Sequence, residues 1–256
     1  MLIVISPAKT LDYKPPVTTS LQTMPDHLDD AAALVKRMRH YSVAELMSLM
    51  AVSEKIAALN VERFKQWRRP FTTHHARQAV LAFKGDVYAG LDATTFDEDD
   101  LSFAQQHLRI LSGLYGQLRP LDLMLPYRLE MGRKIETERG KNLYEFWGDR
   151  ITESLNMQLH QLGENYLINL ASHEYFKVVK PALLQAKIIT PHFKEYKNGE
   201  YKVLGVYAKR ARGLLSRYII KQRITDPQKI KAFNQAGYSF NSDMSNEHDW
   251  VFTRKK

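Results

Sequence analysis

Hydrophobic positions along the chain change repeatedly between strand-like and helix-like spacing. Short runs rich in β-branched and aromatic residues, typical of strands, lie at 2–5, 83–88, 166–170, 238–240 and 250–253. Apolar residues recur at helical spacing over 26–40, 73–81, 97–111, 142–161, 173–184 and 208–222. Asn198-Gly199 lies within 188–206 and predicts the two-residue turn of a hairpin. Because strands and helices are interspersed and one strand pair is antiparallel, we predict an α+β fold with a mixed β-sheet surrounded by helices.

The region 26–71 shows only helical spacing, so we expect it to protrude as a helical subregion of one globular domain spanning 1–256. Within it, Ser42 and Glu45 have the spacing of a capping box, which predicts the start of a helix. A second helical pattern begins at about residue 54, and only Ala51-Val52-Ser53 separate the two patterns. The sequence therefore predicts a helix-hairpin-helix-like element over about 42–67.

A turn of this kind suits a DNA phosphate. The first backbone N–H groups of a helix lack partners and carry partial positive charge, and small residues let a phosphate approach. We expect Ala51 and Ser53 at the turn, with Lys55 beside them, to contact DNA. The usual element has the sequence Leu-Pro-Gly-Val-Gly. This chain has alanine and serine at the two glycine positions, and a residue with a Cβ is costlier than glycine at positive φ. The alternative is an ordinary helical hairpin without a ligand.

Composition narrows the class of protein. Cysteine is absent, which excludes disulfides, thiolate catalysis and cysteine metal sites. Charged residues interrupt every apolar run, so we predict no membrane segment and expect a cytoplasmic protein. The net charge of +9 and the pI near 9.5 favour an anionic partner, nucleic acid first. We expect a monomer that needs no cofactor.

The positive charge clusters near the C-terminal end. Between Tyr201 and Thr225 there are seven basic residues and no acid. A helix over 208–222 would bury its apolar face and expose Arg210, Arg217 and Lys221 on the other side. The residues that we expect to contact DNA here are Lys209, Arg210, Arg212 and Arg217. The acidic run at 97–100 is interpreted as the first turn of the helix that follows it.

Several loop segments carry residues suited to a polar pocket. A lysine with neighbouring hydroxyls follows the first strand, charged side chains lie among Leu, Pro and Met at 126–131, and polar residues follow the strand at 166–170. The candidate pocket residues are Lys9, Arg128, Glu130, Asn169 and Glu174, with Glu130 as a general acid or base. The alternatives are a solvated lysine, an internal Arg–carboxylate network and a helical Glu174–Lys177 ion pair.

The nine histidines give no metal-binding pattern. Neither His-x-x-x-His nor Glu-x-x-His occurs, and adjacent histidines such as His74-His75 point in different directions on a helix. We predict no metal site, and direct iron sequestration has no spacing to support it.

The segments together resemble one family over essentially the whole chain. The matching segments are Ser6-Pro-Ala-Lys-Thr-Leu-Asp-Tyr13, Phe83-Lys-Gly-Asp-Val-Tyr-Ala-Gly-Leu91, Leu111-Ser-Gly-Leu-Tyr-Gly116, Leu118-Arg-Pro-Leu-Asp122, Pro126-Tyr-Arg-Leu-Glu-Met131, Phe146-Trp147, Asn169-Leu-Ala-Ser172, Glu174-Tyr175 and Ala208-Lys-Arg-Ala-Arg-Gly213. In this order they closely resemble the bacterial peroxide-stress protein family YaaA. The last fifteen or so residues match least.

The resemblance implies a cytosolic protein induced under hydrogen peroxide stress and associated with lowering free intracellular iron, which limits oxidative damage to DNA. It also implies binding of duplex, bubble or distorted DNA through a basic cleft and a helix-hairpin-helix element. It implies a mixed α and β fold of its own type and no firmly attached catalytic activity. The hypothesis from sequence is thus a DNA-binding protein of the peroxide response. The alternative is an enzyme acting on a nucleic-acid base or nucleotide in the polar pocket.

Overall fold

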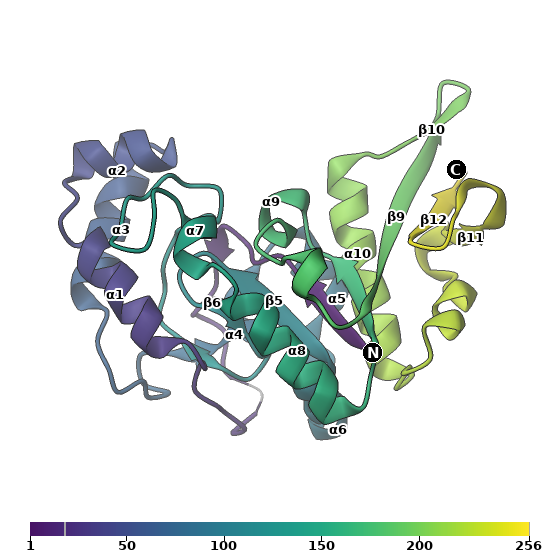
Figure 1. The fold of residues 1–256 in the computed structure, drawn as a ribbon, viewed down its shortest axis with the longest axis horizontal. Coiled ribbons are helices and arrows are strands. Elements are labelled where there is room, and N and C mark those ends of the chain that lie inside the picture. Colours follow the sequence, from purple (N-terminus) through teal and green to yellow (C-terminus); the bar gives the residue numbers. More distant parts are fainter. Residues whose placement is uncertain (18, 256) are drawn as a thin grey trace.

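A mixed eight-stranded sheet forms the centre of the computed structural model, which describes residues 1–17 and 19–255 (Figure 1). Its strands are β1 (Leu2–Ile5), β5 (Leu108–Ser112), β6 (Gly116–Leu118), β8 (Tyr166–Leu170), β9 (Lys187–Lys197), β10 (Glu200–Lys202), β11 (Ser239–Asn241) and β12 (Asp249–Arg254). Their order is β11-β12-β9-β8-β1-β5-β6, and β10 pairs with β9. Helices surround this sheet, which confirms the predicted α+β class.

The middle of the sheet is parallel. β1 pairs in parallel with β5 on one side and with β8 on the other, and β8 pairs in parallel with β9. All four residues of β1 are buried, as a strand covered on both faces requires. The chain leaves β1 for β5 on one side and later adds β8 on the other side. The carboxyl ends of β1 and β8 are therefore a topological switch point, where open sheets commonly bind ligands.

Helices and short strand pairs cover the sheet, and α8 crosses in front of it in Figure 1. The helices outside the subregion are α4 (Ala79–Ala82), α5 (Asp86–Leu91), α6 (Glu98–His107), α7 (Leu143–Trp147), α8 (Arg150–Leu162), α9 (His173–Phe176) and α10 (Gly205–Lys221). The 3₁₀ helices are η1 (Ala93–Thr95), η2 (Pro181–Leu183), η3 (Pro227–Ala232), η4 (Gln235–Gly237) and η5 (Ser242–Met244). Two small sheets pair β2 (Thr10–Leu11) with β4 (Phe83–Lys84), and β3 (Arg77–Gln78) with β7 (Leu123–Met124).

Three helices follow one another within residues 26–71. They are α1 (Leu28–Met38), α2 (Val43–Met50) and α3 (Glu54–Gln66), which gather at one end of the long axis in Figure 1. The capping box is present: Ser42 Oγ accepts the Glu45 N–H at 3.3 Å, and Glu45 Oε2 accepts the Ser42 N–H at 2.7 Å. Leu46 and Phe64 are buried in the same hydrophobic cluster as the sheet residues, so the subregion packs onto the main core.

Two long predicted helices are wrong in part. The helix predicted over 97–111 ends at His107, and the following residues form strand β5, between β1 and β6. Because all five residues of β5 are buried, they show no polar alternation and resemble a continuing helix. The helix predicted over 142–161 is broken at Gly148, whose φ of 54° no helix contains, into α7 and α8.

Shorter elements differ as well. The strand predicted over 83–88 is two residues long, and α5 begins directly after Gly85. The helix predicted over 73–81 is β3 followed by α4, and the helix predicted over 173–184 consists of α9 and η2. The hairpin is confirmed, with Asn198 at φ 54° and Gly199 at φ 87°, as a type I′ turn requires. Within the described residues, no helix combines the length and the apolar character needed to cross a bilayer.

A buried carboxylate joins α6 to the end of α10. Asp100 is 2% exposed. Its Oδ2 accepts a hydrogen bond from Lys221 Nζ, and its Oδ1 accepts one from Arg223 Nη1 at 2.7 Å. It also completes a capping box with Asp97, so the acidic run at 97–100 is the first turn of α6, as predicted. Burial by itself raises the pKa of Asp100, but the hydrogen bonds from Lys221, Arg223 and the Asp97 backbone together outweigh burial and hold the pKa below 3.8.

We expect Asp100→Asn to lower the free energy of unfolding by about 2 kcal/mol at pH 7, because both cations lose their counter-charge while staying partly solvated. The folded pKa lies below the unfolded value, so this contribution is complete above pH about 4 and disappears as the pH falls through the folded pKa. Urea denaturation of both proteins at pH 7 and pH 3 measures the difference. An equal difference at the two pH values would contradict this account of Asp100.

Candidate nucleic-acid interface

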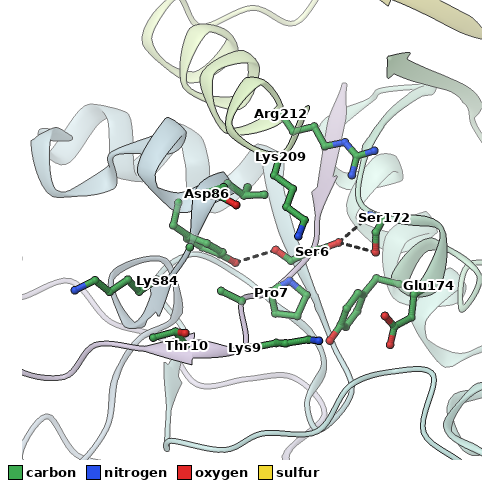
Figure 2. Close-up of a pocket in the computed structure, with 15 residues that line it drawn as sticks. Ser6, Pro7, Lys9, Thr10, Lys84, Asp86, Ser172, Glu174, Lys209 and Arg212 are labelled. Atoms are coloured by element: carbon green, nitrogen blue, oxygen red, sulfur yellow. Dashed lines mark hydrogen bonds between the residues drawn. The ribbon is translucent and has the colours of Figure 1, made fainter. Parts of the chain in front are cut away.

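A cavity of about 420 Å³ opens at the carboxyl edge of the sheet, directly beyond β1 and β8. Its walls are the loop after β1, the loop after β8, the start of α5 and the first half of α10 (Figure 2). The charged side chains that line it are Lys9, Lys84, Asp86, Glu174, Lys209 and Arg212. The cavity thus occupies the switch point that the strand order creates.

Hydrogen bonds hold the floor of the cavity in place. Ser6 Oγ accepts the Ser172 N–H at 2.8 Å and donates to Ser172 Oγ at 3.3 Å, which ties the two strand exits together. The Tyr88 hydroxyl donates to the Ser6 carbonyl at 3.1 Å (Figure 2). Burial raises the pKa of Tyr88 well above 10, so this phenol stays a donor at physiological pH. The loops after β1 and β8 and the helix α5 therefore form one connected support.

Lys209 and Arg212 bring uncompensated positive charge to this support. They lie three residues apart on one face of α10, and Figure 2 shows both side chains directed into the cavity. Within residues 1–17 and 19–255, neither side chain has an acidic partner or a hydrogen-bond acceptor. Burial lowers the pKa of Arg212, yet a guanidinium keeps its proton in proteins. Two cations that make no ion pair, in a cavity where four cations outnumber the two carboxylates of Asp86 and Glu174, make a receptor for an anion.

Most of the rest of the basic run is neutralised within the described structure. Four of its cations have acidic partners: Lys202 with Glu200, Arg217 with Asp92, Lys221 with Asp100, and Arg223 with Asp97 and Asp100. Arg217 is only partly exposed, contrary to the expectation that it faces solvent, whereas Lys221 is exposed as expected but is paired with Asp100. Arg217 donates to the Leu91 and Asp92 carbonyls at 3.1 and 3.0 Å, because α10 packs closely against α5. Arg210 is exposed and lies outside the cavity lining.

Glu130 is the centre of an internal ion-pair network. It is 3% exposed, and its carboxylate lies 3.0 Å from Arg128 Nη2, 3.5 Å from Arg133 Nε and 3.9 Å from Lys9 Nζ. The hollow beside it has a volume of only about 10 Å³, which is barely enough for one water molecule and too small for a substrate. The arrangement favours the internal Arg–carboxylate network over a general acid or base at Glu130.

Of the remaining two pocket candidates, Glu174 lines the cavity and Asn169 does not. Glu174 lines the main cavity with Lys9, and its Oε1 accepts the Gly132 N–H at 3.0 Å. Asn169 is 8% exposed and does not line the cavity. Its side chain accepts the Ala171 N–H at 3.1 Å and donates to Thr190 Oγ1 at 3.4 Å, so it shapes the exit of β8.

Sequence reasoning missed Lys84 and Tyr88 as lining residues. Both lie in 83–88, which was interpreted as a strand, whereas the chain turns into α5 at Gly85. A Cβ at Gly85 would lie 3.3 Å from Ala8 Cβ, so the glycine lets the two loops meet. A glycine directly after Lys84 is the sequence feature that could have indicated a turn there instead of a continuing strand. Lys84 Nζ lies 2.8 Å from Asp12 Oδ2, which neutralises it.

The turn between α2 and α3 forms a second, separate patch. Ala51 has the left-handed backbone (φ 51°, ψ 58°), and Ser53 is the extended N-cap of α3. In the described part of the chain, the N–H groups of Ser53, Glu54 and Lys55 have no acceptor. The three side chains and Ala51 are exposed. In Figure 1 this turn and α10 lie in different parts of the molecule, so the predicted DNA contacts form two patches.

In the part of the chain that the structure describes, histidine, aspartate and glutamate side chains do not converge in the way a metal ion needs. Over residues 1–17 and 19–255, no three of these side chains group into a candidate metal site. Among the described residues, His192 Nε2 and Asp249 Oδ1 lie 2.7 Å apart and form a hydrogen bond between β9 and β12.

Comparison with known proteins agrees with the motifs. Residues 1–244 match the family model described as peroxide stress protein YaaA. The chain is also 57% identical over 256 residues to a UPF0246 protein of Teredinibacter turnerae (strain ATCC 39867 / T7901), covering all of both sequences. The chain therefore belongs to the peroxide stress protein YaaA family.

Proposed function

We propose that the protein binds DNA through its phosphates during the hydrogen peroxide response and protects that DNA from oxidative damage. The observation that carries this proposal is the pair Lys209 and Arg212. Both are unneutralised in the described structure, and both project into a cavity at the switch point of the sheet. A net charge of +9 adds a long-range attraction toward a polyanion.

The start of α3 supports a second phosphate contact. Its free N–H groups carry the positive end of the helix dipole, and the Lys55 ammonium lies in the same turn. Glu54 adds a negative charge there, which weakens this contact relative to the cavity. Two separated contacts on one molecule favour DNA that bends to reach both. Unpaired or distorted duplex bends at lower energetic cost, which accounts for a preference for such DNA.

Protection from iron follows from the same contacts. Cations that condense on the DNA backbone are released when a protein neutralises the phosphates. Ferrous iron is one such cation, so bound protein lowers its local concentration on the covered DNA. This route protects the covered DNA by moving iron away from it, and it leaves the amount of iron in solution unchanged.

A second function, chemistry on a base or nucleotide, is favoured by one observation. Lys9 and Glu174 line the same cavity, which gives a cation and a carboxylate beside the anion receptor. Because Glu130 is walled off, Glu174 is the group that would act as general acid or base. Incubation with oligonucleotides that carry damaged bases tests this function. An absence of product at high protein concentration would count against it.

We expect labelled duplex DNA to bind with micromolar or tighter affinity at about 50 mM salt and to lose about 100-fold in affinity at about 200 mM, as release of counterions from about four phosphates requires. A duplex with an unpaired bubble should bind more tightly than the matched duplex. Lys55→Glu should weaken binding by about tenfold. Fluorescence anisotropy at the two salt concentrations measures all three. Failure to bind at low salt would remove the proposal.

A further inference from the structure

The cavity at the switch point contains acidic side chains opposite its cations. Lys209 and Arg212 enter it from α10, whereas Glu174 follows β8 and Asp86 begins α5 (Figure 2). A groove for the sugar-phosphate chain alone would bind more tightly without carboxylates, because they repel phosphates. The combination instead suits a ligand with an anionic end and a separate group of N–H donors.

Its size agrees with one small ligand. The volume of about 420 Å³ lies within the range of roughly 300–1,000 Å³ that is usual for small-molecule sites. A single nucleotide fits this volume, whereas a DNA duplex is far too wide to enter. Phosphates of a duplex can therefore reach the exposed Lys209 and Arg210 and the part-exposed Arg212 at the mouth of the cavity, but only an unpaired nucleotide or a free one can occupy the interior.

The cationic side is arranged for one phosphate. In Figure 2 the Lys209 ammonium points toward Ser6 and the Arg212 guanidinium toward Ser172. A guanidinium offers two parallel N–H groups to phosphate oxygens, and an ammonium adds a compact charge beside them. Neither cation has to give up an internal acidic partner of the described structure to make these contacts.

The acidic side is arranged for a base with adjacent donors. Glu174 is held by the Gly132 N–H at Oε1, which fixes the carboxylate and leaves Oε2 without a protein donor among the described residues. A carboxylate accepts best from two neighbouring N–H groups. Of the four DNA bases, guanine alone carries such a pair, N1–H and the N2 amino group, on its pairing edge. Pro7 and Tyr175 supply an apolar wall for the ring.

We propose that this cavity binds one guanine nucleotide, with its phosphate on Lys209 and Arg212 and its base against Glu174. The inference rests on the proposed function, because bound DNA is one source of that nucleotide as an extruded, unpaired residue. A free nucleoside monophosphate is the other source, and it has the same chemistry.

Calorimetric titration of the protein with dGMP, dAMP, dTMP and inorganic phosphate tests the site. We expect dGMP to bind at least about tenfold more tightly than inorganic phosphate and than dTMP. Glu174→Gln keeps the acceptor for the Gly132 N–H but loses the negative charge, so its dGMP affinity should fall to about that for dTMP. A circular dichroism melt checks that this variant folds.

Bubble oligonucleotides with unpaired guanine or unpaired thymine then separate the two sources. Tighter binding of the guanine bubble assigns the cavity to an extruded nucleotide, whereas dGMP binding without that preference assigns it to a free nucleotide. If dGMP binds no better than phosphate and the two bubbles bind equally, the inference is overturned. In that case, salt-dependent binding of duplex DNA would still support the proposed function. Conversely, binding of dGMP without binding of duplex DNA would contradict the proposed function and support the nucleotide site in the cavity.

Discussion

Gly213→Ala should lower the free energy of unfolding by about 2–4 kcal/mol, the largest stability effect that we expect from adding one methyl group. A Cβ at Gly213 would lie 1.9 Å from the Val87 carbonyl oxygen and 2.8 Å from the Leu91 nitrogen. On the facing helix, a Cβ at Gly90 would lie 2.2 Å from the Arg210 oxygen. The backbones of α5 and α10 therefore touch at these two glycines, and no side-chain movement can make room.

The helical preference of alanine recovers only about 1 kcal/mol of this cost. The site should suffer as well, because α5 carries Asp86 and Tyr88 while α10 carries Lys209 and Arg212. Urea denaturation gives the stability, and a thermal melt should shift down by roughly 5–15 °C for a chain of this size. The matched control is Gly205→Ala at the start of the same helix, where no atom lies within 4 Å of the added Cβ. If the two variants had equal free energies of unfolding, α5 and α10 would be able to move apart without loss of stability, which would contradict this prediction.

Features with a local side-chain mechanism were predicted correctly from the sequence. Ser42 and Glu45 form their capping box without help from the rest of the chain, and Asn198-Gly199 adopts its turn because both residues tolerate positive φ. The α+β class followed from interspersed strands and helices. These predictions depend on spacings of a few residues, which the sequence displays directly.

The elements that were wrong depend on distant neighbours. Leu108–Ser112 is a strand because β1 and β6 pair with it on either side, and burial on both faces removes the polar alternation that marks a strand. The break between α7 and α8 depends on a single left-handed residue, Gly148. A glycine inside a helical pattern is compatible with a helix, so the pattern alone does not reveal the break.

The candidate site shows the same division. The basic residues on α10 were identified by type, but their partners lie more than a hundred residues away. Arg217 and Lys221 have the spacing of the DNA-contact candidates, yet Asp92 and Asp100 neutralise them. Lys209 and Arg212 have no ion-pair partner among the described residues, although Asp86 and Glu174 line the same cavity. Tertiary packing decides which cations have an acidic partner, and the spacing of residues in the sequence does not reveal that packing.

The double variant Lys209→Glu/Arg212→Glu should weaken DNA binding by about 100- to 1,000-fold at low salt, the largest functional effect that we expect. Each charge-assisted contact to a phosphate contributes about 1.5–3 kcal/mol, and reversal adds repulsion to the lost attraction. The slope of log affinity against log salt should become less steep by about two, because two phosphates are no longer neutralised. Neither residue has an internal partner in the described structure, so folding should change little.

Lys187→Glu is the control for the reversal of one lysine, with half the charge change of the double variant. Lys187 is exposed and begins β9, opposite Tyr166 at the amino end of β8, so it lies at the edge of the sheet away from the cavity. The same charge reversal there should change DNA affinity by no more than about threefold, through the net charge alone. Anisotropy titrations of the wild type and both variants at several salt concentrations give the affinities and slopes. If the control loses half as much in log affinity as the double variant, or more, DNA binding depends only on the total charge, and the cavity at the ends of β1 and β8 has no special part in holding DNA.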